Sequence, residues 1–434
     1  MALDFPRFFK ASNPSKTLNL SRENDRRYYI DFSSVRGGKI IRELERTITR
    51  LSPDEPTCQL FTGHIGCGKS TELLRLKAEL EQQNFHVVYF ESSRDLDMAD
   101  VDISDILLAI ARQVSESLEA IQIRLQPGYF IGLFGEIADW LQTPVDLAAE
   151  AELSLGIGKI TAQTKHSPKL RSQLRQHLEP RTNGLLDAIN QELLLPAQEK
   201  LQQQGYQGLV VIIDNLDRVD SATKPSGRSQ PEYLFVDRGE QLKKLSCHVV
   251  YTVPLALVFS NDLSRLSNRF GIDPKVLPMV RVQQRDGSAC ASGMDLLRQM
   301  VLARAFPHLE PQARLAQIDA VFDAPETLDR LCRVSGGHVR NLLVLLYRCL
   351  QQDDPPIDRD CLERVICQRC NELSLAITPE EWALLKRVSQ AKQVRGEAEH
   401  QLLLRSLFVF GYRDRDQTWF DLNPIFAEAK ELQP

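Results

Sequence analysis

The chain has 434 residues, of which 43% are hydrophobic and 26% charged, and 53 basic against 58 acidic side chains give a net charge of −5. This length predicts two or three domains, and the acidic balance argues against a protein that coats nucleic acid by bulk charge. No apolar run approaches the ~18 residues of a membrane span, the first residues lack the order of a secretory signal, and the nine scattered cysteines do not suggest a disulfide framework. We therefore predict a reduced, cytoplasmic protein.

The first elements predicted along the chain are a helix over 40–49, a short strand over 57–61 and a helix over 69–81. The last two flank a glycine-rich loop with the residues Gly63, His64, Ile65, Gly66, Cys67, Gly68, Lys69 and Ser70, followed by Thr71. Glycines let backbone N–H groups turn inward around a phosphate, and the helix N-terminus adds its dipole beneath that anion. Lys69 is expected to reach the β- and γ-phosphates, and the Ser70 hydroxyl to bind Mg²⁺. This P-loop predicts a site for ATP with Mg²⁺.

A strand over 86–90 comes next, and 118 residues separate it from the following predicted strand, too many for one crossover. Helical spacing of apolar residues over 103–118 and 171–201 predicts a long helical insertion at about 103–207. The stretch 126–167 is less regular, and within it 129–141 is aromatic and amphipathic. Core packing is the favoured interpretation of 129–141, and a partner contact or a membrane surface remains the alternative.

The run 209–213 is apolar at every position. It is followed by Asp214, Asn215, Leu216, Asp217 and Arg218. Such a run predicts a central parallel strand that is covered on both faces. Asp214, at its carboxyl end, is expected to hold Mg²⁺ through water. The amide of Asn215 cannot accept a proton, so Asp217 is the candidate for orienting an attacking water, with pairing to a basic neighbour as the alternative. We therefore expect slow hydrolysis, or a switch that rarely turns over.

The remaining core elements are a loop over 224–230, a strand over 248–252 that ends in Thr252, a helix over 263–270 that contains Arg269, and a closing edge strand over 276–282. A helix over 341–350 follows the glycine pair at 336–337. Cys361, Cys367 and Cys370 raise the possibility of a zinc site, but buried helical thiols fit the apolar pattern around them better.

The C-terminal segment predicts a small separate module. Thr378-Pro379-Glu380-Glu381 is a capping box with proline at the first helical position, so it predicts a helix over 382–388. A second helix over 397–407 and a hairpin from 408–413 and 418–422 complete a partial winged-helix pattern. Its second helix carries more acidic than basic residues, so structural or protein-binding use is favoured over DNA reading.

The order of these elements resembles AAA+ and STAND ATPases, including the origin-recognition branch of AAA+, and 214–218 is similar to the D-x-L-D-R signature of KAP-type P-loop ATPases. The resemblance implies further roles for four parts of the chain: an adenine-binding motif at Val35 and Arg36, a γ-phosphate sensor at Thr252, an arginine finger at Arg269 and a lid sensor at Arg340. Surface salt bridges are the alternative for both arginines. STAND proteins usually place a proline after the glycine pair, and this chain has His338-Val339 there.

We therefore predict an α/β fold with a three-layer P-loop NTPase core and parallel sheet (1–290), a helical lid (291–375) and a winged-helix-like module (376–434). The expected function is an ATP-binding, slowly hydrolysing switch in conformation and oligomeric state, which forms homo-oligomers and acts on a protein partner that the sequence does not identify. A DNA-binding ATPase of the origin-recognition type and an ATP-binding scaffold without turnover are the alternatives.

Overall fold

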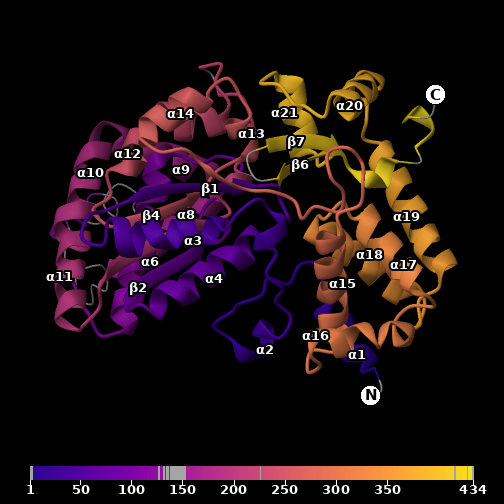
Figure 1. Cartoon of the computed structure of the whole chain (residues 1–434). Coiled ribbons are helices and arrows are strands. Elements are labelled where there is room, and N and C mark those ends of the chain that lie inside the picture. Colours follow the sequence, from indigo (N-terminus) through magenta and orange to yellow (C-terminus); the bar gives the residue numbers. More distant parts are fainter. Residues whose placement is uncertain are drawn as a thin grey trace.

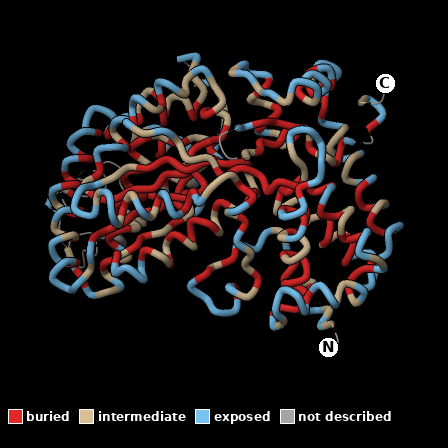
Figure 2. Tube along the Cα trace, viewed as in Figure 1, coloured by how far each residue is buried: buried red, intermediate tan, exposed pale blue. Residues whose placement is uncertain are grey.

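The computed structural model describes residues 3–125, 128–130, 132, 136, 153–224, 226–414, 417–427 and 429–432. A sheet with its flanking helices forms one lobe, a helical lid forms the other, and a C-terminal hairpin lies where they meet (Figure 1). Buried residues follow the strands of the sheet and continue into the lid (Figure 2). No helix within the described ranges combines the length and the apolarity needed to cross a bilayer.

Five parallel strands build the sheet in the order β2-β3-β4-β1-β5. Their bounds are Cys58–Gly63 for β1, Phe85–Glu91 for β2, Gly208–Asp214 for β3, His248–Thr252 for β4 and Lys275–Leu277 for β5. The predicted closing strand over 276–282 was too long, because β5 ends at Leu277, just before Pro278, which has no N–H to donate to a ladder. The strand order places β4 between the P-loop strand and the acidic strand.

Helices cover both faces of this sheet, which confirms the predicted three-layer core. Val210 and Ile212 of β3 face a cluster formed with α3 (Ile40–Arg46) and α4 (Lys69–Glu81). The alternate residues Val211 and Ile213 face the larger cluster of the insertion and its neighbours. Since both faces of β3 are buried, its sequence is apolar at every position from 209 to 213 rather than alternating.

The predicted insertion is helical where the structure describes it. Its helices are α6 (Ile103–Ala120), α8 (Leu153–His166), α9 (Pro168–Leu178), α10 (Thr182–Ala188) and α11 (Leu195–Gln203). Most of the aromatic stretch 129–141 lies outside the described residues, so its interpretation stays untested. Shorter helices complete the core: α5 (Ser92–Asp95), α12 (Gly239–Lys243), α13 (Leu255–Val258) and α14 (Leu263–Phe270).

The lid consists of α15 (Ala291–Ala305), α16 (Pro311–Leu315), α17 (Pro325–Val334), α18 (Val339–Gln352) and α19 (Arg359–Ser374). The start of the chain, which we expected in the core domain, packs here: α1 (Phe5–Ala11) contacts α15, and Phe9 stacks on Tyr347 of α18. The short α2 (Glu23–Arg26) follows in the segment that leads back to the core. Along α19, Cys361 is buried and Cys367 exposed, and the described residues hold no group of three potential metal ligands.

The C-terminal module contains α20 (Pro379–Ala391), α21 (Ala398–Arg405) and an antiparallel hairpin of β6 (Val409–Asp414) and β7 (Gln417–Leu422). The capping box forms as predicted: Thr378 Oγ1 accepts from the N–H of Glu381, whose carboxylate accepts from the N–H of Thr378. Phe410 of the hairpin belongs to the same core cluster as Phe61 of β1. The hairpin thus packs partly on the ATPase core, and helices α20 and α21 share a hydrophobic cluster with the lid.

Candidate functional site

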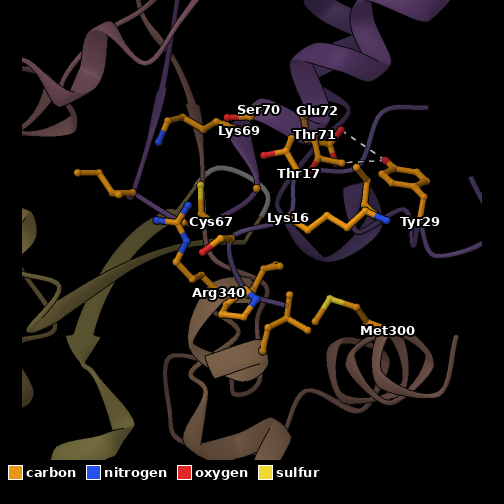
Figure 3. A pocket seen from close by; sticks show the side chains of 18 of the residues that line it. Lys16, Thr17, Tyr29, Cys67, Lys69, Ser70, Thr71, Glu72, Met300 and Arg340 are labelled. Carbon is orange, nitrogen blue, oxygen red and sulfur yellow. Dashed lines mark hydrogen bonds between the residues drawn. The ribbon is translucent and has the colours of Figure 1, made fainter. Parts of the chain in front are cut away.

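A cavity with an empty volume of about 870 Å³ lies between the P-loop and the lid. Its wall is formed by the P-loop, by the end of β3, by α15 and α18 of the lid, and by the N-terminal segment 14–32. Figure 3 shows Lys69, Ser70 and Thr71 on one side of this cavity and Met300 on the other.

The P-loop has the backbone that its glycines predict. Gly66 and Gly68 have φ of +89° and +106°, and a Cβ on Gly66 would stand only 2.8 Å from the ring of His338. Both positions therefore require glycine, one of them also because the lid approaches so closely. Helix α4 begins at Lys69, so its N-terminus lies under the loop, as phosphate binding requires.

The P-loop lysine forms a buried ion pair. Lys69 Nζ lies 3.0 Å from Asp217 Oδ2, and the two side chains are only 6% and 3% exposed. Nζ also donates to the carbonyl oxygens of Gly63 and His64. Burial opposes the charge on Lys69, but the carboxylate of Asp217 outweighs it and raises the pKa of Lys69. The alternative considered for Asp217, pairing with a basic neighbour, is thus what the structure contains.

The two predicted metal ligands lie beside each other. Asp214, fully buried, interacts with the Ser70 hydroxyl and accepts a hydrogen bond from Tyr89 Oη at 2.8 Å. Burial, and then the nearby Asp217, raise the pKa of Asp214. A hydroxyl and a carboxylate are oxygen donors suited to Mg²⁺, which binds through few protein ligands together with phosphate and water. The residues present therefore fit a Mg²⁺ ion bound together with a nucleotide.

Asn215 and Thr252 shape the turn after β3. Asn215 has a φ of +67°, a conformation that asparagine tolerates better than most residues, and it lines the cavity. The Thr252 hydroxyl donates to the carbonyl of Ile213 at 3.2 Å and accepts from the N–H of Leu216 at 3.0 Å. Thr252 therefore ties β4 to the turn that carries Asp217, and its direct contact with a γ-phosphate stays a prediction.

The arginines named from the sequence occupy different places. Arg340 lines the cavity, and its pKa is lowered by burial and by the neighbouring Arg218, which lines the cavity as well. Arg36 is buried at the cavity wall and donates to the Cys67 carbonyl at 2.7 Å. Val35 is buried against the lid and is not among the lining residues. Arg269 lies outside the cavity, half exposed and 3.6 Å from Glu240.

Two buried histidines hold the P-loop to the rest of the molecule. His64 Nε2 accepts from the N–H of Gly411 in β6 at 2.9 Å, and His338 Nε2 donates to the Ile65 carbonyl at 2.8 Å. His338 Nδ1 also accepts from the N–H of Asn341, so His338 caps α18. Burial lowers the pKa of His64 to about 3 and that of His338 to about 4. The unexpected His338 thus joins the lid to the loop.

Sequence reasoning missed the wall opposite the P-loop. The residues that line it come from the N-terminal segment and the lid, among them Leu18, Tyr28, Met300, Arg304 and Leu343. They belong to no local motif and come together only through the docking of the N-terminal segment beside the lid. Alternating apolar residues near Tyr28 were the one available signal, and they do not distinguish a binding wall from a core.

Residues 38–224 match the model of the KAP family P-loop domain, so this part of the chain is similar to that domain. Among solved structures, the chain is similar to a Walker-type ATPase of Pyrococcus abyssi (12% identity, 96% of this chain and 98% of that one covered, TM-score 0.46). It is also similar to the ORC2 protein of Aeropyrum pernix in ADPNP–ADP complexes (12%, 88% and 89%, TM-score 0.39) and to the ORC1 protein of the same organism in complex with DNA (13%, 90% and 91%, TM-score 0.37). No curated protein sequence matches the chain.

Proposed function

We propose that this protein is an ATP-dependent conformational switch that hydrolyses ATP slowly. One observation carries the proposal: the P-loop is hydrogen-bonded both to the lid, through His338 and Ile65, and to the C-terminal hairpin, through His64 and Gly411. A loop that binds phosphate and also contacts two other modules transmits any change in its own geometry to them.

The charges of the site suggest how ATP would act. The γ-phosphate competes with Asp217 for Lys69, because a phosphate offers the lysine more negative charge than one carboxylate does. Lys69 donates to the carbonyls of Gly63 and His64, so moving its ammonium group frees the backbone next to the hairpin contact. Bound Mg²⁺ would neutralise phosphate charge, with Ser70 and Asp214 as its protein partners. Arg340 and Arg218 supply the remaining positive charge at this end of the cavity.

Slow turnover follows from the residues after β3. The amide of Asn215 cannot accept a proton from water, and Asp217 is engaged by Lys69. Asp217 orients a water only when Lys69 leaves it for a phosphate. The ion pair therefore favours binding and conformational change over rapid chemistry.

The experiment compares wild type with Lys69→Ala. By calorimetry with Mg²⁺, wild type should bind ATP and the variant should lose most affinity, since a charge-assisted contact contributes about 1.5–3 kcal/mol. Hydrogen exchange should then report the output: a slowly hydrolysed ATP analogue should change protection at 409–422 in wild type and leave the variant unchanged. If the analogue binds and the hairpin does not respond, the switch proposal is wrong while ATP binding stands.

The proposal includes self-association on ATP and an unidentified protein partner, because the chain shows no effector motif of its own. It also includes a cytoplasmic location, supported by nine cysteines that are all free thiols.

A further inference from the structure

Arg304 is a buried arginine of the cavity wall that has no acidic partner among the residues that the structure describes. Arg304 of α15 lines the cavity and is only 4% exposed. Its Nη1 donates to the carbonyl of Met300, one turn earlier in the same helix, at 2.8 Å. Its Nε is buried and has no hydrogen-bond partner in the part of the chain that the structure describes.

Arg36, which also lines the cavity, likewise has a buried Nε without a hydrogen-bond partner. Another buried guanidinium group of the chain is paired. Arg281, equally enclosed, has Asp414 at 2.8 Å and also donates to Gln284 and to the carbonyl of Val35. Around Arg304 burial lowers the pKa to about 10, so the group is still charged at neutral pH. A buried charge without its hydrogen-bond partners is costly, and such a group in a cavity wall is suited to a ligand that supplies the missing acceptor.

The position of Arg304 indicates which part of a nucleotide it meets. Its guanidinium lies beside Met300, and Figure 3 places Met300 across the cavity from Lys69 and Ser70. With the phosphates at the P-loop, the opposite wall receives the base. Leu18, Tyr28 and Leu343 give that wall apolar and aromatic surface, which suits a flat ring more than a ribose. Polar residues of the N-terminal segment, Ser15, Lys16 and Thr17, line the cavity as well.

We propose that Arg304 reads the nucleobase, donating a hydrogen bond to a ring nitrogen of a purine. This inference rests on the proposed function and names the part of the ligand that the lid recognises. Arginine only donates, so it pairs with the acceptors N1, N3 or N7 of adenine and not with its amino group. The base would thereby join α15 to the core when ATP binds.

The first test compares ATP with inorganic tripolyphosphate, which has no base, by calorimetry with Mg²⁺. Arg304→Met should weaken ATP roughly ten- to a hundredfold and leave tripolyphosphate unchanged. Equal losses for both ligands would mean that Arg304 acts on phosphate, and unchanged ATP affinity would mean that it does not act at all. Either result overturns the inference. If wild type binds neither ligand, it is the proposed function that fails.

The second test keeps the wild-type chain intact and so does not depend on how the variant folds. Of 1-deaza-, 3-deaza- and 7-deaza-ATP, one should bind about tenfold or more weakly than ATP. That difference should disappear in Arg304→Met, and in Arg304→Leu if the methionine variant does not fold. If all three analogues bind as ATP does, or the difference persists without the guanidinium, Arg304 does not read the base.

Discussion

At the scale of single residues, the ion pair between Lys69 and Asp217 links binding to chemistry. Both groups are buried, and each is the charged partner that makes burial of the other tolerable. A phosphate that takes over Lys69 leaves Asp217 with a free oxygen beside Asn215, where a water would be oriented. The same carboxylate thus serves as a partner of the lysine and as the candidate base.

Turnover should therefore depend on the two residues differently. We expect wild-type hydrolysis below roughly 1 per second, at the low end of the enzyme range. Asn215→Glu should raise the rate because it supplies an acceptor for the proton, whereas Asp217→Asn should lower it. Phosphate release under single-turnover conditions measures both. Brisk wild-type turnover that Asp217→Asn leaves untouched would show that Asp217 is not the base.

Residues in continuous motifs were the ones that sequence could predict. The P-loop residues and Asp214 sit in local patterns, and the structure places Lys69 and Ser70 together at the cavity. Arg304 has no such pattern, because its role arises from a lid helix that meets the N-terminal segment 14–32 across the cavity. Arg269 was predicted from element order alone, and the structure places it outside its own cavity.

At the scale of elements, the hairpin is the part whose position could not be predicted. Sequence reasoning found its strands and the helix α21, since both depend on local patterning. It did not predict their docking, which depends on Gly411 meeting His64 and on α21 packing against α13. A helix that reads DNA has to enter a groove, and Gln401 and Arg405 of α21 instead line a cavity shared with the core. This packing favours a structural use of α21.

The two buried histidines should make stability fall in acid. In the unfolded chain a histidine takes up a proton below pH ~6.5, while folded His64 and His338 stay neutral down to about 3 and 4. Above pH 6.5 these histidines therefore leave the free energy of unfolding unchanged. As the pH falls from there toward the folded pKa values, each histidine lowers the free energy of unfolding by up to about 1.4 kcal/mol per pH unit. Urea unfolding at pH 7, 6 and 5 measures the slope.

Substituting either histidine by asparagine should make that slope shallower, because asparagine does not titrate. His166→Asn is the matched control, since His166 is exposed and its replacement should leave the slope unchanged. An unaltered slope in both buried variants would show that other groups carry the acid sensitivity.

At the scale of the whole molecule, the cavity takes its walls from three parts of the chain that are distant in sequence. The core contributes the P-loop, the lid contributes α15 and α18, and the N-terminal segment closes one side. A ligand that bridged all three would stabilise one arrangement of the lobes, which is how ATP would act in the proposed switch. The half-exposed Arg269 lies outside this cavity, beside Glu240.

We predict that ATP promotes self-association and that Arg269 then acts in trans. A guanidinium supplied by a neighbour stabilises transition-state charge only when both the γ-phosphate and the second subunit are present. Lys69→Ala and Arg269→Ala subunits, each inactive alone, should regain part of the hydrolysis when mixed, because the first lends its Arg269 to the ATP of the second. A mixture of Lys69→Ala and Arg340→Ala subunits should stay inactive, since Arg340 lines the cavity of its own chain. Light scattering at high protein concentration with a slowly hydrolysed ATP analogue tests the self-association. If it finds only monomers, Arg269 does not act in trans and is only a surface partner of Glu240.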